Sequence, residues 1–384
     1  MSDQTSLKLG VKLGLKVGLA GAFAGTGALA LLTGARRLLG GPRVHILGFH
    51  RVVDDMAKLG GEVIPALCIT TSAFDRILQL AQKRFEVLSL AEAVAALAGR
   101  RKLDRDALVI TFDDGYRDVY LRALPVLQKH KLPATVFVPS GFIGSPEPLL
   151  HDRLHALFTR VEREGRRLDG APAPRLLRRT MVLAETLIRD RGPAAALGHL
   201  IDSQPAQVLR HLAEAIEDLS GDTVTIDEGA RVMSADELRA CSDGGIEVGA
   251  HTVDHVVLVR ESAARVLHEL SRPTAEIESI TGRPCESFAY CKGLWTPALL
   301  PALRSAGYTT AVTTTDRPNL PGCDPLLLGR KVLWEGHTSG LGGGFSTALV
   351  QAHLHDLFGT IGLIRPLEGM RARPEEMIAW RRSA

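Results

Sequence analysis

The sequence predicts an α/β fold, because apolar segments of β character run directly into polar turns. Residues 109–112 form one such segment, which ends at Asp113 and Asp114. Residues 248–250 form a second, which ends at His251. Polar side chains at the carboxyl ends of strands are typical of functional sites in α/β folds. With 384 residues the chain could form one large core or two domains, and a single core with extensions fits better.

The first motif, Thr-Phe-Asp-Asp-Gly-Tyr at residues 111–116, places two carboxylates at the end of a buried strand. Successive residues of a strand point to opposite faces, so Asp113 and Asp114 are expected to have different roles. Taken alone, an Asp-Asp turn is more often a solvated turn or a helix cap.

The second motif, His-Thr-Val-Asp-His, begins at His251 and ends at His255. Two histidines four residues apart can converge on one ion where the segment between them coils. With one carboxylate they leave coordination positions open, as a catalytic metal requires. A lone pair of this spacing is usually an exposed helix pair, but both motifs follow β-like segments, which favours a metal site.

These residues resemble the polysaccharide deacetylase family, also called carbohydrate esterase family 4, whose shared unit is the chitooligosaccharide deacetylase or nodulation-protein B homology domain. The resemblance spans roughly residues 43–330 and is interrupted by an insertion. It implies a distorted (β/α)7-type barrel, one divalent metal, commonly zinc, and removal of acetyl groups from N-acetylated sugars. By position, Asp113 resembles the general base, and the residues that resemble the metal ligands are Asp114, His251 and His255.

Further segments resemble the same family. Residues 47–52, with His50, resemble the opening strand, and residues 133–138 resemble the second strand. Residues 288–293 resemble a Phe-Ala-Tyr-Pro-x-Gly signature of one branch, but Cys291 stands in place of the proline. The side chains expected to contact substrate are His50, Tyr116, Tyr290 and Lys292.

Two further catalytic roles follow from the resemblance. Family members commonly orient the base with an arginine. Arg330 is expected to do so here, and Lys292 is the second choice for this role. The general acid is commonly a histidine near the last strand, which predicts His337, with His355 and His50 as alternatives. A surface histidine remains the simpler interpretation of His337 and of His355.

Composition excludes several other classes of protein. The net charge of +3, from 46 basic and 43 acidic residues, gives no strong field for nucleic acid, and no nucleic-acid motif is present. The five cysteines include no Cys-x-x-Cys pair, which excludes a zinc ribbon, and their odd number argues against a complete disulfide framework. Aromatic residues make up only 5%, which is low for a long groove lined by stacking rings and favours a short or unusual glycan.

Three segments surround or interrupt the expected barrel at residues 41–338. Residues 1–40 include an uncharged run, residues 17–35, which could just span a bilayer. A membrane anchor, an interfacial helix and a soluble arm all remain open, so the protein is either membrane-associated, with a periplasmic face among the options, or cytoplasmic in a bacterium. Residues 149–227 are expected to insert two to four helices that either cap the pocket or serve structure alone, beginning with a His151-Asp152-Arg153 segment found in some family members. Residues 339–384 are expected to form a C-terminal helical extension, ending in Arg381-Arg382.

The leading functional hypothesis is a metal-dependent hydrolase that uses an activated water to remove N-acetyl groups from a chitooligosaccharide, polysaccharide or lipid-linked glycan. One alternative is hydrolysis of a non-sugar amide or an O-acetyl ester by the same centre. Another is a non-catalytic glycan-binding protein on the same fold. Zinc is favoured, although two imidazoles and a carboxylate also suit cobalt, nickel, manganese or iron. The oligomeric state stays open.

Overall fold

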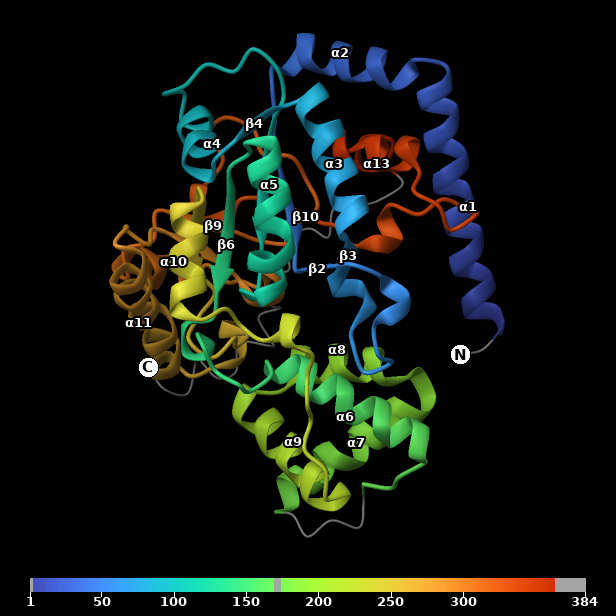
Figure 1. Cartoon of the computed structure of the whole chain (residues 1–384), viewed down its shortest axis with the longest axis vertical. Helices are drawn as coiled ribbons and strands as arrows, with labels where there is room; N and C mark the ends of the chain where they lie inside the picture. The colour runs from blue at the N-terminus through green and yellow to red at the C-terminus, as the bar shows by residue number, and fades with distance from the viewer. Residues whose placement is uncertain (1–2, 169–173, 363–384) are drawn as a thin grey trace.

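A parallel sheet, curled into a distorted (β/α) barrel, forms the centre of the molecule (Figure 1). The structure is a computed structural model that describes residues 3–168 and 174–362. Seven strands follow the order β10-β1-β5-β6-β7-β8-β9, and β4 pairs with the first half of β5. The predicted fold is thereby confirmed. The strands of this sheet are β1 (Val44–Phe49), β4 (Glu86–Leu88), β5 (Ala107–Phe112), β6 (Ala134–Val138), β7 (Ile246–Ala250), β8 (Ser287–Ala289), β9 (Thr310–Val312) and β10 (Lys331–Val332).

The sheet curls until its two ends meet at residues 328–333. On one side the Thr313 N–H donates to the Leu328 carbonyl at 2.8 Å. On the other side the Leu333 N–H donates to the Gly48 carbonyl, also at 2.8 Å. The carboxyl ends of the strands therefore surround a common centre.

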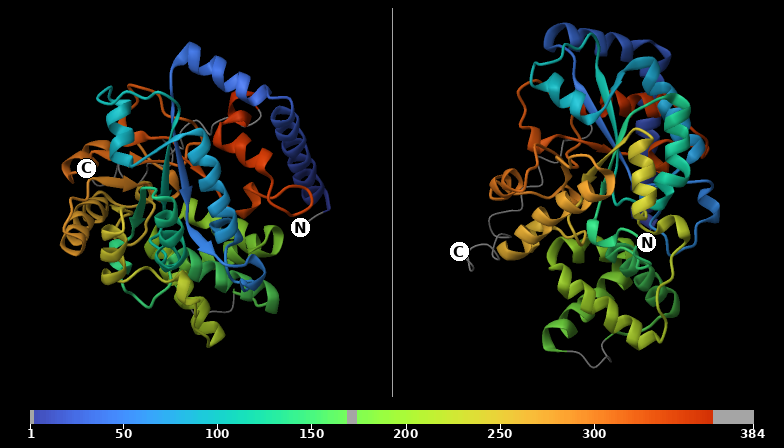
Figure 2. Two further views of the ribbon diagram at one scale, coloured as in Figure 1. Left: turned by 45° about the horizontal axis from the view of Figure 1, so that its top comes forward. Right: turned by 60° about the vertical axis from the view of Figure 1, so that its left-hand side comes forward.

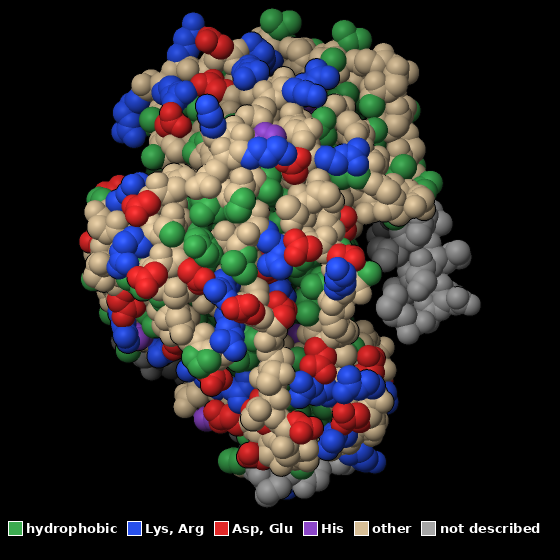
Figure 3. Space-filling view, viewed as in Figure 1, with side chains coloured by type: hydrophobic (Ala, Val, Ile, Leu, Met, Phe, Trp, Pro, Cys, Tyr) green, Lys and Arg blue, Asp and Glu red, His purple; other side chains and the backbone are tan. Residues whose placement is uncertain are grey.

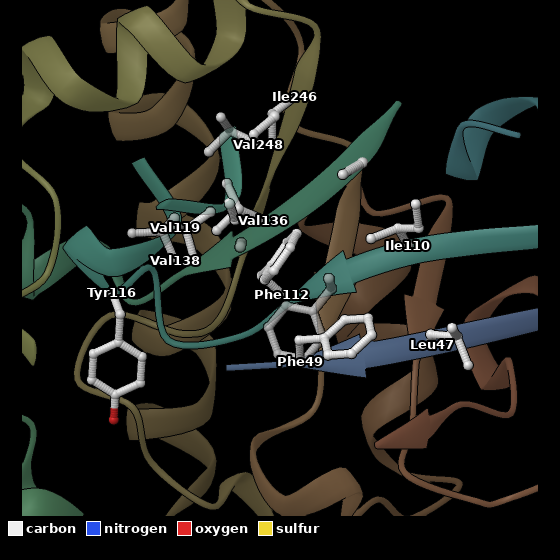
Figure 4. Packing of buried hydrophobic residues seen from close by; sticks show 14 of the residues in the cluster. Leu47, Phe49, Ile110, Phe112, Tyr116, Val119, Val136, Val138, Ile246 and Val248 are labelled. Atoms are coloured by element: carbon white, nitrogen blue, oxygen red, sulfur yellow. The ribbon is translucent and has the colours of Figure 1, made fainter. Parts of the chain in front are cut away.

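The strands are apolar on both faces because both faces are covered. Every residue of β1 and β5 is buried, and Figure 4 shows Leu47, Phe49, Ile110 and Phe112 packed in one cluster. Two further strands, β2 (Arg51–Val53) and β3 (Cys68–Thr70), pair with each other. The helices around the barrel are α3 (Thr71–Arg84), α4 (Leu90–Leu97), α5 (Leu124–His130), α10 (Ala235–Asp243), α11 (Ala263–Thr281) and α12 (Leu299–Ser305).

Among the described residues of the 149–227 insertion the chain forms four α-helices, and the sequence predicts two to four. They pack around an apolar core of their own. This insertion lies beyond the carboxyl ends of the strands, as the green helices below the barrel show in Figures 1 and 2. Most of the predicted linker at residues 169–174 lies outside the described residues. The four helices are α6 (Leu150–Glu164), α7 (Arg175–Arg191), α8 (Pro193–Ser203) and α9 (Ala206–Ser220).

The N-terminal segment forms two helices, α1 (Asp3–Gly25) and α2 (Ala28–Gly40), with a left-handed residue, Gly27, at the break. Among the described residues no single helix has the length and hydropathy of a membrane span, and only the pair together, bent by 79°, reaches that threshold. The pair packs on the C-terminal helices α13 (Thr347–Leu354) and α14 (Leu357–Thr360). Arg381-Arg382 lies outside the described residues.

The outer face of α2 is apolar and exposed. Leu31, Leu38 and Leu39 are 75%, 89% and 90% exposed. Hydrophobic side chains protrude over α2 at the top edge of Figure 3, whereas charges of both signs are mixed over the rest of the visible face. Membrane association through this segment stays a prediction.

Candidate active site

The sheet register brings the two sequence motifs together at one end of the barrel. The Asp113 N–H donates to the Phe49 carbonyl at 2.9 Å, and the His251 N–H donates to the Val138 carbonyl at 3.0 Å. These bonds extend the ladders of β5 and β7 into the motifs. Gly115 follows at a φ of 60°, and a Cβ at this position would lie only 2.8 Å from Val138 Cγ1. The turn after the first motif therefore requires glycine.

The backbone of the site loops is unusual. Asp114, Thr252, His255 and Lys292 all have positive φ, between 53° and 69°. Only two other non-glycine residues in the described part of the chain do so. Such conformations persist where the surrounding structure imposes them, and they cluster at functional sites.

Asp113 is held by Arg330 through a two-pronged ion pair. Both guanidinium nitrogens lie 2.6 Å from the Asp113 carboxylate oxygens, and Nη1 also donates to Thr111 Oγ1 at 3.1 Å. Arg330 is completely buried, and its Nε donates to the Thr313 carbonyl at 3.2 Å. Burial opposes ionisation of Asp113, but Arg330 and then His251 outweigh it and lower its pKa. The carboxylate is therefore ionised and fixed in orientation.

Asp114, His251 and His255 converge from two loops. Asp114 Oδ1 lies 2.9 Å from His255 Nε2 and 3.4 Å from His251 Nε2. Nδ1 of His251 lies 2.7 Å from the Ala289 carbonyl and donates to it, which leaves the lone pair of Nε2 directed at Asp114. Burial opposes ionisation of Asp114, yet the histidines, His255 first, hold its pKa well below the ordinary value.

This donor set fits a divalent metal. Asp114 Oδ1 is buried and has no hydrogen-bond partner among the described residues, despite the two imidazoles beside it. An anionic oxygen that faces a nitrogen lone pair is satisfied by a cation between them. Three protein ligands of this type leave room for water or substrate.

Cys291 offers an alternative third ligand. The ligand atoms of His251, His255 and Cys291 lie within 4.8 Å of one another, so this group could also hold a metal. However, Cys291 Sγ lies 3.9 Å from Nδ1 of His251, the nitrogen already bonded to Ala289. Because the free Nε2 faces Asp114, the geometry favours the carboxylate over the thiol.

A cavity of about 230 Å³ opens above these residues. Its floor is polar and comes from the barrel: His50, Asp113, Asp114, His251 and His255. Its opposite wall comes from the insertion and is largely apolar. The insertion therefore caps the cavity, one of the two roles considered for it.

Two of the four expected substrate contacts reach this cavity. His50 and Lys292 line it, and Lys292 Nζ also lies 2.7 Å from Asp202 Oδ1 in α8. Tyr290 does not, because it is buried in the core and its hydroxyl donates to the Leu326 carbonyl at 3.1 Å. Tyr116 is also buried and is not among the lining residues.

The candidates for general acid are separated by the structure. His337 lies outside the cavity, between the rings of Trp334 and His353, and burial lowers its pKa to about 4. His355 stacks on Phe85 and lines a different hollow. Of these three candidates only His50 lines the cavity, with Nε2 3.9 Å from Asp113 Oδ2. The expectation for His337 is thus corrected, because the segment after β10 carries it toward α13.

His151, at the start of the insertion, is a cavity residue that the sequence interpretation did not assign to the site. Its Nε2 lies 3.7 Å from Asp114 Oδ2 and 2.8 Å from the Tyr116 hydroxyl. Burial, and then Asp152, raises the pKa of Tyr116, so the hydroxyl stays protonated and donates to Asp152 Oδ2 at 2.7 Å. The available signal was a His-Asp pair in the first turn of an amphipathic helix.

Comparisons with known proteins identify related sequences. The profile of the family described as polysaccharide deacetylase matches residues 100–169 and 197–311. Poly-beta-1,6-N-acetyl-D-glucosamine N-deacetylase of Escherichia coli (strain K12) is 32% identical over 96 residues, which are 25% of this chain and only 13% of that protein.

The fold is shared with a solved structure. A de-N-acetylase from Aggregatibacter actinomycetemcomitans has a TM-score of 0.51 at 16% identity, over 81% of this chain and 100% of that one. IcaB from Ammonifex degensii has a TM-score of 0.48 at 21% identity, over 77% and 93%. With its fold, its two motifs and the profile match, this chain belongs to the polysaccharide deacetylase family.

Proposed function

We propose that this protein is a metal-dependent hydrolase that removes the acetyl group from the nitrogen of an amino sugar. One observation carries the proposal: a buried carboxylate fixed by an arginine, Asp113, shares a cavity with the donor set Asp114, His251 and His255. A glycan-binding protein without activity has little need for a base beside a metal site.

Each chain residue has a distinct task in this reaction. A divalent metal held by Asp114, His251 and His255, with zinc favoured, would polarise the acetyl carbonyl and make water more acidic. Asp113 accepts a proton from the attacking water, because it is ionised and both of its oxygens are held by Arg330.

His50 is proposed to complete the proton transfer. The oxygen of water bonds to the carbonyl carbon, the carbon–nitrogen bond breaks, and the nitrogen must gain a proton to leave as an amine. His50 Nε2 lies 3.9 Å from Asp113 Oδ2, so one bridging water or a small shift of the ring is needed for His50 to receive the proton collected there and pass it to the nitrogen. The products are acetate and a free amino sugar, so all atoms and protons are accounted for.

A second candidate is hydrolysis of a non-sugar amide. It is favoured by the apolar insertion wall, which offers few partners for sugar hydroxyls. The chemistry at the floor of the cavity would be the same, because it requires only an acyl group on nitrogen.

The test is acetate release from N-acetylglucosamine and its oligomers by the zinc-loaded protein. Asp113→Asn and His251→Ala are expected to abolish release. Matched controls are Asp243→Asn and His268→Ala, since both residues are exposed on the outer helices α10 and α11. Release by the wild type and by both controls, but by neither site variant, supports the proposal. A zinc-loaded protein that releases no acetate from any N-acetyl sugar contradicts it.

A further inference from the structure

The insertion presents one continuous apolar face to the cavity. Ala194, Leu197, Gly198 and Ile201 follow one another along the same side of α8, at helical spacing. The apolar residues that extend this wall are Leu150 of α6, Ala206 and Leu209 of α9, and Ile64 and Leu67 from the segment before β3. We call the four residues of α8 and these five the apolar wall.

The apolar wall lacks the groups that recognise sugar rings. Apart from His151, the described residues of the insertion contribute one polar side chain to the cavity, that of Gln204. No Phe, Tyr or Trp is among the described residues that line the cavity. Hydroxyls buried against such a wall would lose their hydrogen bonds to water without replacement, and a sugar ring would find no aromatic platform.

Empty space in front of α8 shows that this face is not simply closed by packing. A Cβ built on Gly198 would meet no heavy atom of the described residues within 4 Å. The Gly198 carbonyl accepts from Lys292 Nζ at 3.5 Å, and Lys292 also pairs with Asp202, so two contacts tie α8 to the barrel here. The wall is thus held at a fixed place opposite the catalytic floor, with room between them.

We infer that the substrate carries an apolar chain beside the scissile amide, and that the apolar wall binds this chain. This inference rests on the proposed function, since it concerns the same cavity. The chain can belong to the acyl side, as an N-acyl group longer than acetyl, or to the glycosidic side, as in an amino sugar linked to a lipid. Both sources present the same chemistry to the wall.

Two substrate series distinguish these sources. The first is the methyl and hexyl glycosides of N-acetylglucosamine, and the second is glucosamine N-acylated with acetyl or hexanoyl groups. We expect kcat/KM to rise at least about tenfold with chain length in one series, because each buried methylene favours binding several-fold. A rise in the first series assigns the chain to the glycosidic side, and a rise in the second assigns it to the acyl side.

Variants of the wall test whether α8 causes the preference. Gly198→Leu fills the space in front of the helix, and Ile201→Asn makes the wall polar. Both are expected to lower the ratio of hexyl to methyl kcat/KM, or of hexanoyl to acetyl, by about tenfold. Leu267→Asn is the control, since Leu267 is exposed on α11 and should leave the ratio unchanged. An unchanged ratio in both wall variants contradicts the inference.

A binding measurement separates this inference from the proposed function. Calorimetry with the Asp113→Asn protein compares affinities for the methyl and hexyl compounds of both series without turnover. Tighter binding of a hexyl or hexanoyl compound supports the inference even if no hydrolysis is ever detected, in which case only the proposed function fails. Equal affinities within both series overturn the inference and leave the deacetylase proposal standing if the methyl glycoside is hydrolysed.

Discussion

The two halves of the cavity differ in chemistry and in the structure that supports them. The barrel half presents ionisable side chains from the carboxyl ends of the strands, in positions set by the sheet register. The insertion half presents aliphatic side chains from helices with a separate core. Reactive groups need the precise placement that a sheet provides, whereas an apolar wall needs only shape. We therefore expect the insertion to determine which substrates reach a common catalytic floor.

The largest effect is expected from loss of a metal ligand on the barrel half. Asp114→Asn should weaken zinc binding by at least about a hundredfold, because even partners that only support a ligand are worth about 10–100-fold. The measurement is competition with a chromophoric chelator, followed by assay of acetate release after zinc is restored. Chelation alone should abolish wild-type activity reversibly.

Cys291→Ser is the matched comparison for this experiment. It should leave zinc affinity nearly unchanged, because the thiol lies beside the nitrogen of His251 that is bonded to Ala289. If Cys291→Ser weakens binding and Asp114→Asn does not, the thiol and not the carboxylate is the third ligand.

The Asp113–Arg330 pair should show the next largest effect, on stability as well as activity. Arg330→Met leaves a buried carboxylate without its partner, so the free energy of unfolding should fall by about 3–5 kcal/mol. The measurement is denaturant unfolding, with the double variant Asp113→Asn/Arg330→Met as the control. The double variant should recover part of the loss. An equal loss in both would show that Arg330 stabilises the barrel through Thr111 and Thr313 instead.

Substitution of His50 tests the corrected assignment of the general acid. His50→Gln should lower kcat by about 10²–10⁴-fold, the usual contribution of a positioned acid or base, with zinc affinity retained. His337→Gln and His355→Gln should leave kcat close to the wild-type value, since neither residue lines the cavity. A large fall in kcat for His337→Gln, with His50→Gln unaffected, would restore the original expectation.

The smallest effect on catalysis is expected from α2, which has an apolar exposed face but is remote from the cavity floor. If this face lies on a membrane, Leu38→Gln/Leu39→Gln should reduce co-sedimentation with vesicles of phosphatidylglycerol and phosphatidylcholine. Activity on a soluble sugar should not change. Leu267→Gln is the control for an exposed leucine elsewhere, and equal sedimentation of all three proteins would contradict the membrane prediction.

Much of the barrel half could be predicted because its chemistry is local in the sequence. Asp113 and Asp114 directly follow the strand that presents them, and His251 and His255 share one short loop. The helices of the insertion were equally visible from their periodicity. Arg330 was found only through the resemblance, since 217 positions separate it from Asp113.

The remaining parts depend on which surfaces the folded chain brings together. Periodicity predicts that α8 is a helix, but it does not state that Gly198 faces a cavity opposite Asp114. The same limit explains Tyr290, whose side chain turns into the core, and His337, which leaves the site with the chain after β10. By itself the sequence determined the fold class and predicted the candidate catalytic groups, because strands and motifs are short-range patterns. Only the tertiary structure decided which histidines line the cavity and what the cavity wall is made of, because those depend on contacts between segments far apart in the chain.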